Sequence, residues 1–453
     1  MTEQAAVPTF TGTVDLHALH RYAPERYPFL LQSTATTQSL GRYDILFAYP
    51  GEALLLEARG QLVGPYSEGQ AEFLRALDAW WSAQRTAPVT MDVPFSGGWF
   101  LYLGYELAGE VEPALALHAD TAMPIAMAVR CPAAVIFDHQ RKHCSIVVED
   151  SAAAYRDTIA GDIEACARNA ATHTNGTCSQ LDTVEEDPAL FLEAVVRAQE
   201  LIASGDIYQA NLSRQWSGTA AQGADADQIY EALRESNPAP FAGLVDWRGT
   251  TIISSSPERL LKVRDGIVST RPIAGTRPRS ASSDIDDNLS AELFAHPKER
   301  AEHIMLIDLE RNDLGRICEP GSVEVDEMMV LESYAHVHHI VSNVRGRLRK
   351  EVTPGDAIRA VFPGGTITGC PKFRCMQIIS ELENGARGAY TGSFGYLNLD
   401  GSLDLNILIR TIVMRDSDVS FRAGSGIVAD SEAQAELAET RAKAKGLLQA
   451  LST

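Results

Sequence analysis

The sequence predicts an α+β fold built on antiparallel sheets. Strand-like and helix-like segments alternate irregularly, so that no regular βαβ series can be traced. No internal repeat divides the chain. Its 453 residues, 45% of them hydrophobic, can bury the core of one very large domain or of two or three ordinary ones.

The first region, residues 1–180, is expected to be a mixed α and β region. Runs of aromatic and aliphatic residues predict its strands, and apolar residues at helical spacing predict its helix. The strands are expected at Tyr43–Tyr49, Ala53–Leu56, Trp99–Leu103 and Ala133–Phe137, and the helix at Glu72–Gln84. From Arg168 to Asp187 the sequence is polar and rich in turn residues, which is typical of a surface connection.

The second region, residues 185–453, begins with a helical pattern after Pro188. This pattern stops at Gly205, and glycine suits a helix C-cap. Further along, strands are expected at Thr251–Ser255, Val337–Val344, Phe394–Leu397 and Ile407–Arg415, and helices at Lys298–Leu309, Lys372–Leu382 and Ala433–Leu448. This irregular order fits antiparallel sheets better than a parallel series.

The charge of the chain restricts its partners. With 39 Lys and Arg against 60 Asp and Glu, the formal net charge is -21, which repels nucleic acid. A small anionic substrate would need a local cationic site made by Arg, Lys, a helix N-terminus or a metal ion. The first ten residues lack the pattern of a signal peptide, and no run of about 20 apolar residues is present, so we expect a cytoplasmic protein that does not enter a membrane.

Two pairs of glutamates stand out for their spacing. Glu299 and Glu302 are three residues apart in one expected helix, and Glu436 and Glu439 repeat this spacing in the last helix, so each pair shares a helix face. If the two helices meet, the carboxylates repel one another unless a cation or protons intervene. Mg²⁺ suits such oxygen ligands. Solvated faces of acidic helices show the same spacing and are more common.

Neighbouring residues favour an anion-binding pocket beside these glutamates. Lys443 lies one helical turn after Glu439. Gly424 and Gly426 belong to a glycine-rich segment that precedes the last helix. Backbone N–H groups in such a segment can approach a carboxylate closely, because no Cβ intervenes.

Two further segments carry candidate groups with alternative roles. Thr366 and Thr368 lie in a segment rich in Gly and Pro that leads into an expected helix. This segment either binds a carboxylate or forms a structural turn with Pro371 at the helix N1 position. Arg410 ends the apolar strand Leu405–Ile409, where it pairs either with a substrate carboxylate or with an internal one.

Tyr390 and His339 complete the candidates. Tyr390, in a turn before Gly392, either donates a hydroxyl hydrogen bond or packs. His339 lies in the strand-like run HVHHIV, in which His336 and His338 face the other side. It either protonates a departing hydroxyl or is merely hydrogen-bonded. The motifs of common hydrolases, dehydrogenases, phosphate-loop enzymes and HExxH zinc enzymes are missing from the sequence.

Seven segments in fixed order resemble the chorismate-utilising enzymes. They are SSSPERLL at Ser254–Leu261, RPIAGTRPR at Arg271–Arg279, KERAEHIMLIDLERNDLGR at Lys298–Arg316, HVHHIVS, FPGGTITGCPK, ILIRT and GSGIVADS. The segments PFLLQS, RYDI and LGYEL extend a weaker match into the first region. The resemblance implies large antiparallel sheets in a β-sandwich core flanked by helices. It also implies a chorismate-binding catalytic domain on which the N-terminal region packs.

The resemblance implies roles for the matching residues. Mg²⁺ would be approached by Glu302 and Glu439, with Glu299 and Glu436 as close or water-mediated partners. The carboxylates of chorismate would be held by Thr366, Tyr390, Arg410, Gly424, Gly426 and Lys443. The catalytic group would comprise His339, which assists loss of the ring 4-hydroxyl, together with Glu258, Thr276, Gln209 and Ala274.

Gln209 and Ala274 bear on the nucleophile. Members of the family that add water carry a lysine at the position of Gln209. Glutamine cannot deprotonate water, so an amine nucleophile is favoured. We expect ammonia from a separate glutaminase subunit, because the chain has no recognisable glutaminase triad. Ala274 occupies the position at which many aminodeoxychorismate synthases carry a lysine. The motif around it, PIAGT, is usual in anthranilate synthases.

The remaining motifs favour component I of aminodeoxychorismate synthase, and component I of anthranilate synthase stays open as the alternative. YQANL with Asn211, NPAPFAG, the doubled histidine and TITGCPKFRC are similar to the first. The first leads to 4-aminobenzoate and folate, and the alternative leads to tryptophan. LLQS replaces the LLES that is associated with tryptophan feedback, but the resemblance still allows a tryptophan pocket at Ser33, Pro240 and Phe241.

Overall fold

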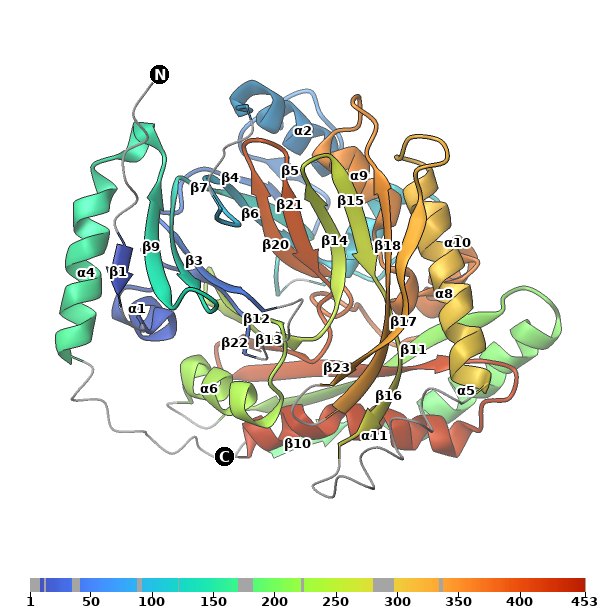
Figure 1. Cartoon of the computed structure of the whole chain (residues 1–453). Coiled ribbons are helices and arrows are strands. Elements are labelled where there is room, and N and C mark those ends of the chain that lie inside the picture. The colour runs from blue at the N-terminus through green and yellow to red at the C-terminus, as the bar shows by residue number, and fades with distance from the viewer. Residues whose placement is uncertain are drawn as a thin grey trace.

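Two large antiparallel sheets pack face to face and carry helices on their outer surfaces (Figure 1). The computed structural model describes residues 9–11, 14–34, 41–87, 92–120, 122–169, 182–220, 224–279, 297–333 and 337–452. The predicted α+β class and the sandwich core flanked by helices are confirmed.

The first sheet has 12 strands within the described residues. Their order is β1-β9-β8-β3-β2-β12-β13-β22-β23-β11-β10, and β19 pairs with β11. The strands are β1 (Thr9–Thr11), β2 (Phe29–Gln32), β3 (Tyr43–Ala48), β8 (Ala133–Asp138), β9 (His143–Val148), β10 (Asp182–Glu185), β11 (Gln209–Thr219), β12 (Phe241–Trp247), β13 (Thr250–Ser256), β19 (Gly369–Cys370), β22 (Thr411–Arg415) and β23 (Asp418–Ile427).

The second sheet has 11 strands within the same ranges. Their order is β16-β18-β15-β14-β21-β20-β6-β7-β4-β5, and β17 pairs with β18. The strands are β4 (Ala53–Leu56), β5 (Leu62–Val63), β6 (Gly98–Leu103), β7 (Ala126–Cys131), β14 (Arg259–Arg264), β15 (Ile267–Arg271), β16 (Ile273–Pro278), β17 (Glu324–Ser333), β18 (Val337–Arg347), β20 (Ser393–Asn398) and β21 (Leu403–Asn406).

Helices cover the outer face of each sheet. The first sheet packs against α1 (Leu16–Tyr22), α4 (Tyr155–Asn169), α6 (Ala226–Ser236) and α11 (Ala433–Leu451). The second sheet packs against α2 (Phe73–Gln84), α8 (Pro297–Gly315) and α9 (Pro354–Val361). The shorter or connecting helices are η1 (Tyr105–Leu107), α3 (Ala108–Val111), η2 (Asp150–Ala152), α5 (Pro188–Ala203), η4 (Gly365–Ile367) and α10 (Lys372–Leu382).

The core between the sheets follows from the alternation of side chains along each strand. In β2, Phe29 points into the sandwich, whereas its neighbour Leu30 points outward, under the helices. The ring of Phe29 stacks on that of Phe100 from the other sheet, with 4.2 Å between the centroids. Phe47 meets Phe100 edge-on at 5.5 Å. Aromatic packing of this kind joins the two sheets into one core.

Both sheets contain strands from both expected regions of the chain. In the first sheet β2 pairs with β12, and in the second β6 pairs with β20. The two regions therefore share their sheets instead of each forming a sheet of its own. The centre of the expected connection, residues 170–181, lies outside the described residues, so the division at 1–180 and 185–453 remains a prediction.

Most predicted elements are found, with one wrong strand. The helix predicted at Lys372–Leu382 has these limits in the structure. The strand predicted across Leu405–Ile409 and on to Arg415 is instead broken, because β21 ends at Asn406 and β22 begins at Thr411. Between them the chain crosses from the second sheet to the first. Arg410 lies in this crossing with a φ of 52°, so it does not end a strand.

Within the described residues, no helix has both the length and the apolar composition that crossing a bilayer would demand.

Candidate active site

Two glycines of β23 form the floor of the candidate site. Gly424 lies opposite Ser213 of β11, and Gly426 lies opposite Asn211. A Cβ on Gly424 would come within 2.7 Å of Tyr390 Oη and 2.8 Å of Asn211 Oδ1. Such distances are too short for a side chain, so glycine lets the polar groups approach the backbone. The glycine-rich segment is thus placed beside Tyr390, as the sequence suggested.

Carboxylates from two helices reach this floor. A Cβ on Gly426 would lie 3.3 Å from Glu302 Oε1 of α8, which also accepts a hydrogen bond of 2.8 Å from Gln209 Nε2. On α11, Glu439 forms an ion pair with Lys443, with 2.8 Å between Nζ and Oε1. Lys443 Nζ also donates to the carbonyl oxygen of Gly424 at 3.0 Å. Glu302 therefore lies beside Gly426, and Glu439, far away in sequence, is linked to Gly424 through Lys443.

The other two glutamates differ in what the structure shows. Glu436 is buried and accepts hydrogen bonds from the hydroxyls of Ser425 and Ser431, the second at 2.6 Å. It therefore ties α11 to the end of β23. The side chain of Glu299 lies outside the described residues. Among the side chains that are described, no group of three His, Cys, Asp or Glu is gathered as a ready-made metal centre.

The donors at this site nevertheless fit a hard divalent cation. Glu302 and Glu439 offer oxygen ligands on either side of the glycine floor. Mg²⁺ commonly takes only one or two carboxylates and completes its coordination with water and substrate oxygens. Glu439 is about half exposed, with 48% of its side chain accessible, so its carboxylate can be reached from solvent although it pairs with Lys443.

Arg410 provides a buried positive charge. Its pKa is lowered by burial, which the charge of Glu258 partly offsets. Its Nη1 donates to Asn237 Oδ1 at 3.2 Å, and within the described residues it forms no ion pair. The internal salt bridge that the sequence left open is therefore not found. A guanidinium held in this way is the local cationic site that an anionic ligand needs in a chain of net charge -21.

Glu258 and His339 are buried, and burial shifts the pKa of each. Burial raises the pKa of Glu258 to about 7, and the charge of Glu310 adds to this, so the carboxyl is only partly ionised near neutral pH. Burial and the charge of Arg410 lower the pKa of His339 to about 3, so its imidazole is neutral. A carboxyl group with a pKa near 7 can donate a proton at neutral pH. A neutral imidazole can donate one hydrogen bond and accept another.

The segment that carries Thr366 differs from its predicted form. Thr366 lies in η4, followed by β19, and α10 begins only at Lys372. Pro371 occupies the N-cap and not the N1 position. The hydroxyl of Thr368 donates to the carbonyl of Gly364 at 2.9 Å, so Thr368 stabilises the turn. Thr366 therefore lies in η4 and not at the start of α10, and the predicted N1 position of Pro371 is wrong, whereas a carboxylate-binding role of Thr366 stays a prediction.

Ala274 and Thr276 lie on β16, next to the strand of His339. Ala274 is buried opposite Ile340, and Thr276 is opposite His339 in register. A bulge at Gly275 separates the two pairs. The side chain of Thr276 lies outside the described residues. The methyl group of Ala274 places no nucleophile at this point of the strand.

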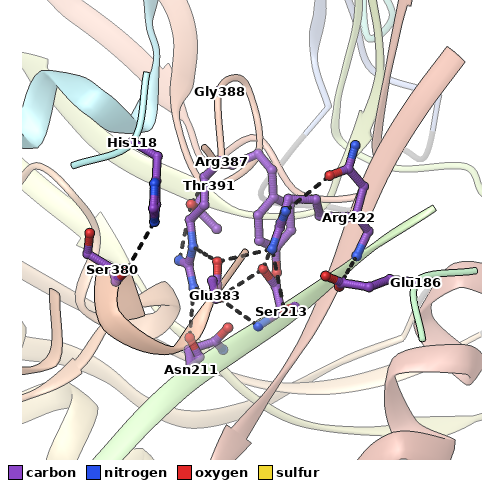
Figure 2. A network of polar contacts seen from close by, with 12 residues as sticks. His118, Glu186, Asn211, Ser213, Ser380, Glu383, Arg387, Gly388, Thr391 and Arg422 are labelled. Carbon is purple, nitrogen blue, oxygen red and sulfur yellow. Dashed lines mark hydrogen bonds and ion pairs between the residues drawn. The ribbon is translucent and has the colours of Figure 1, made fainter. Parts of the chain in front are cut away.

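A buried ion network centred on Glu383 contacts β11 and β23, the pair of strands that contains the glycine floor (Figure 2). Glu383 at the end of α10 accepts hydrogen bonds from Arg387 and from the backbone and hydroxyl of Ser213. Arg422 of β23 donates to the same carboxylate at 3.2 Å. The two guanidinium groups keep the pKa of Glu383 low although it is fully buried. Two cations against one carboxylate leave a positive charge next to the site.

Arg387 uses all five of its N–H donors in this network. Nε and Nη2 bind Glu383, and Nη2 also donates to the carbonyl of Asn211 at 2.8 Å. Nη1 donates to the carbonyl of Ile367 at 3.0 Å and to the hydroxyl of Thr391 at 3.3 Å. Arg387 therefore joins β11, η4 and the loop of Tyr390. Sequence analysis missed it, although its neighbours in RGAYTG include Tyr390.

The segment LGYEL from the first region supports this loop. Glu106 accepts hydrogen bonds from the backbone N–H groups of Arg387 and Gly388, at 2.9 Å and 3.2 Å to Oε1. The carboxylate is buried and lies about 280 residues away in sequence. The N-terminal region thus contributes directly to the position of a candidate site loop.

A separate cavity of about 270 Å³ lies between the sheets. Its lining includes Ser33, Pro240 and Phe241, the three residues of the expected tryptophan pocket. Gln32 also lines it and donates to Asp44 at 3.2 Å. The structure therefore brings these three residues together around a cavity, away from Gly424.

The sandwich and this site of carboxylates, glycines and a buried arginine define an enzyme that takes a small anionic ligand. The chain belongs to the chorismate binding enzyme family, whose model matches residues 27–449.

The relatives carry names of two activities. The anthranilate synthase component I-like protein of Synechocystis is 40% identical over 91% of this chain and 83% of its own length. Aminodeoxychorismate synthase component 1 of Bacillus subtilis is 38% identical over 83% of this chain and 82% of its own length. The crystal structure of anthranilate synthase component I from Streptococcus pneumoniae has a TM-score of 0.78 at 33% identity, covering 90% of this chain and 92% of that one.

Proposed function

We propose that this chain is component I of aminodeoxychorismate synthase, which aminates chorismate to 4-amino-4-deoxychorismate for 4-aminobenzoate and folate synthesis. Ammonia comes from a glutaminase subunit, and the enzyme works in the cytoplasm. The observation that carries the proposal is Gln209, whose amide binds Glu302 beside Gly426. An amide cannot remove a proton from water. Ammonia attacks through its own lone pair and needs no base to remove a proton first, so it suits this position.

Several groups of the candidate site suit the carboxylates of the substrate. Arg410 offers a buried guanidinium that forms no ion pair within the described residues. Thr366, Tyr390, Lys443 and the backbone of Gly424 and Gly426 surround the floor on which a carboxylate can lie. Glu302 and Glu439 would hold Mg²⁺, with Glu299 and Glu436 nearby. When bound, the ion offsets the charge of a substrate carboxylate and polarises the ring.

The proton for the departing 4-hydroxyl is assigned to Glu258. Its pKa of about 7 keeps it partly protonated near neutral pH. A C–N bond forms from the lone pair of ammonia, the C4–O bond breaks, and the hydroxyl leaves as water with the proton of Glu258. His339, which is neutral, orients this hydroxyl by a hydrogen bond. Thr276, opposite His339 in register, is included in the catalytic group.

Anthranilate synthase component I is the second candidate. Ala274 is buried and carries no amine that can attack the ring, so ammonia itself must be the nucleophile. An alanine at this position is usual in the PIAGT motif of anthranilate synthases, and several relatives are named anthranilate synthase component 1. The two functions differ in where nitrogen remains on the ring and in whether pyruvate is eliminated.

Product identity decides between the two functions. The purified chain is incubated with chorismate, ammonium chloride and Mg²⁺, and the product is identified by mass and fluorescence. A non-fluorescent amino product that becomes 4-aminobenzoate only after a lyase is added supports the first function. Fluorescent anthranilate without a lyase establishes the second and contradicts the first. No conversion of chorismate contradicts both.

The cavity at Ser33, Pro240 and Phe241 is proposed to hold tryptophan as a structural or regulatory ligand. It is lined on both sides by the sheets and contains a side-chain amide, Gln32, in addition to aromatic groups. Calorimetric titration with tryptophan tests it, and no heat of binding at millimolar ligand contradicts it.

A further inference from the structure

Two buried amide oxygens at the site accept no hydrogen bond within the described residues. They are Oε1 of Gln209 and Oδ1 of Asn211. The two residues are separated by one position on β11, so their side chains share a face of the strand. Gln209 is only 3% exposed. Buried acceptors are almost always satisfied in folded proteins, so this pair indicates a ligand that donates hydrogen bonds.

The orientation of both amides is fixed by partners that can only accept. Gln209 directs its nitrogen to the carboxylate of Glu302 at 2.8 Å. Asn211 directs its nitrogen to the carbonyl of Thr366 at 3.5 Å. A carboxylate and a carbonyl have no proton to give, so in each amide the nitrogen must face the partner. Both oxygens are therefore left for a ligand.

The groups around the subsite favour a ligand rich in hydrogen-bond donors. The amide oxygens and the carboxylate of Glu302 all accept, and the hydroxyl of Tyr390 lies near the same glycine, Gly424, as Asn211 Oδ1. Water offers two O–H donors, whereas ammonia offers three N–H donors and still keeps its lone pair for attack.

We propose that Gln209 Oε1 and Asn211 Oδ1 form the subsite that binds the attacking ammonia, and that Asn211 is a specificity-determining residue for it. The inference rests on the proposed amination of chorismate. Asn211 is well placed for this task because Arg387 Nη2 holds its backbone carbonyl at 2.8 Å. Its backbone N–H is held by the carbonyl of Thr368 at 2.9 Å. The strand cannot shift here without breaking both contacts.

The experiment measures the KM for ammonium and the KM for chorismate separately, with the purified chain and saturating Mg²⁺. Asn211→Leu keeps the size of the side chain and removes the oxygen. We expect its KM for ammonium to rise about tenfold, the effect of one buried hydrogen bond, with the KM for chorismate unchanged. Asn211→Ser, whose side chain stays polar but is too short to reach the ligand, should give the same split.

Asn343→Leu is the matched control, because Asn343 lies on β18 and bonds Asp326 at the surface. Its two KM values should equal those of the wild type. An unchanged KM for ammonium in both Asn211 variants overturns the subsite and leaves water as its occupant. An equal rise of both KM values also overturns it, because it indicates a structural role. A wild-type chain that does not convert chorismate with ammonium contradicts the proposed function itself.

Discussion

At the scale of single residues, the site depends on carboxylates in contrasting surroundings. Glu302 accepts a hydrogen bond from the amide of Gln209 next to Gly426, and Glu439 forms a partly exposed ion pair with Lys443. Glu258 is fully buried and its pKa is raised to about 7. The surroundings of each carboxylate therefore decide its role: Glu302 and Glu439 suit a cation, and the buried Glu258 suits proton transfer.

The first prediction concerns the cation ligands. Glu302→Gln or Glu439→Gln removes one negative charge without changing size and should lower kcat at least a hundredfold at 1 mM Mg²⁺, because a ligand of the ion is lost. Activity is measured by chorismate consumption while Mg²⁺ is varied. Glu319→Gln, at a surface position, is the control. Wild-type turnover in both site variants would contradict the assignment of Glu302 and Glu439 as ligands of the cation.

The second prediction concerns pH. Because the reaction uses the protonated carboxyl of Glu258, kcat/KM for chorismate, measured at a constant concentration of free ammonia, should fall as pH rises through about 7, where this group loses its proton. At lower pH the protonated fraction is larger, so this group does not limit the rate there. Glu258→Gln should lower the rate and abolish the decline near pH 7. A decline that persists in Glu258→Gln would show that another group causes it.

Sequence analysis found these residues more readily than their contacts. The sequence itself shows the glutamates three residues apart, the glycine-rich segment, and Arg410 directly after an apolar run. The ion network of Glu383 and Arg387 was not found, since charged residues near a helix end ordinarily face water. Only the fold shows that these two are buried.

At the scale of elements, the sequence predicted most helix boundaries closely, although α8 continues to Gly315 beyond the predicted end at Leu309, and it predicted no sheet partners. The limits of α10 and the start of α11 agree with the apolar spacing, because helical contacts are local in sequence. The crossing at Ile407–Arg410 was mistaken for part of a strand, because a buried connection is as apolar as a strand. Strand pairing joins distant segments, and one sequence does not reveal it.

The third prediction concerns the junction of β11, η4 and the loop after Arg387. Lysine has three donors in place of five, so Arg387→Lys leaves the charge near Glu383 but loses at least two hydrogen bonds. We expect the free energy of unfolding to fall by about 2–4 kcal/mol and the KM for chorismate to rise. Urea denaturation and steady-state kinetics measure both.

The control for this junction is Arg345→Lys, on the exposed side of β18, where the guanidinium meets Glu324 in solvent. It should leave stability and KM unchanged. If Arg387→Lys behaves like this control, Arg387 does not position the loop.

At the scale of the whole molecule, the aromatic layer between the sheets holds the enzyme together. Phe29 is fully buried and stacks on Phe100. The fourth prediction is that Phe29→Ala lowers the free energy of unfolding by about 3–5 kcal/mol, because it leaves a cavity between the sheets. Urea denaturation measures it, with the exposed Tyr22 (Tyr22→Ala) as control. A loss equal to that of the control would contradict the role of this layer.

The position of β22 and β23 has a consequence for synthesis. Both strands lie in the interior of the first sheet, between β13 and β11, yet they come later in the chain than every other strand of that sheet. Until they are synthesised, β13 is paired only with β12, and β11 only with β10 and β19, so the two edges that will receive β22 and β23 are unpaired. A nascent chain in this state exposes two strand edges to other chains until Thr411–Ile427 has been made.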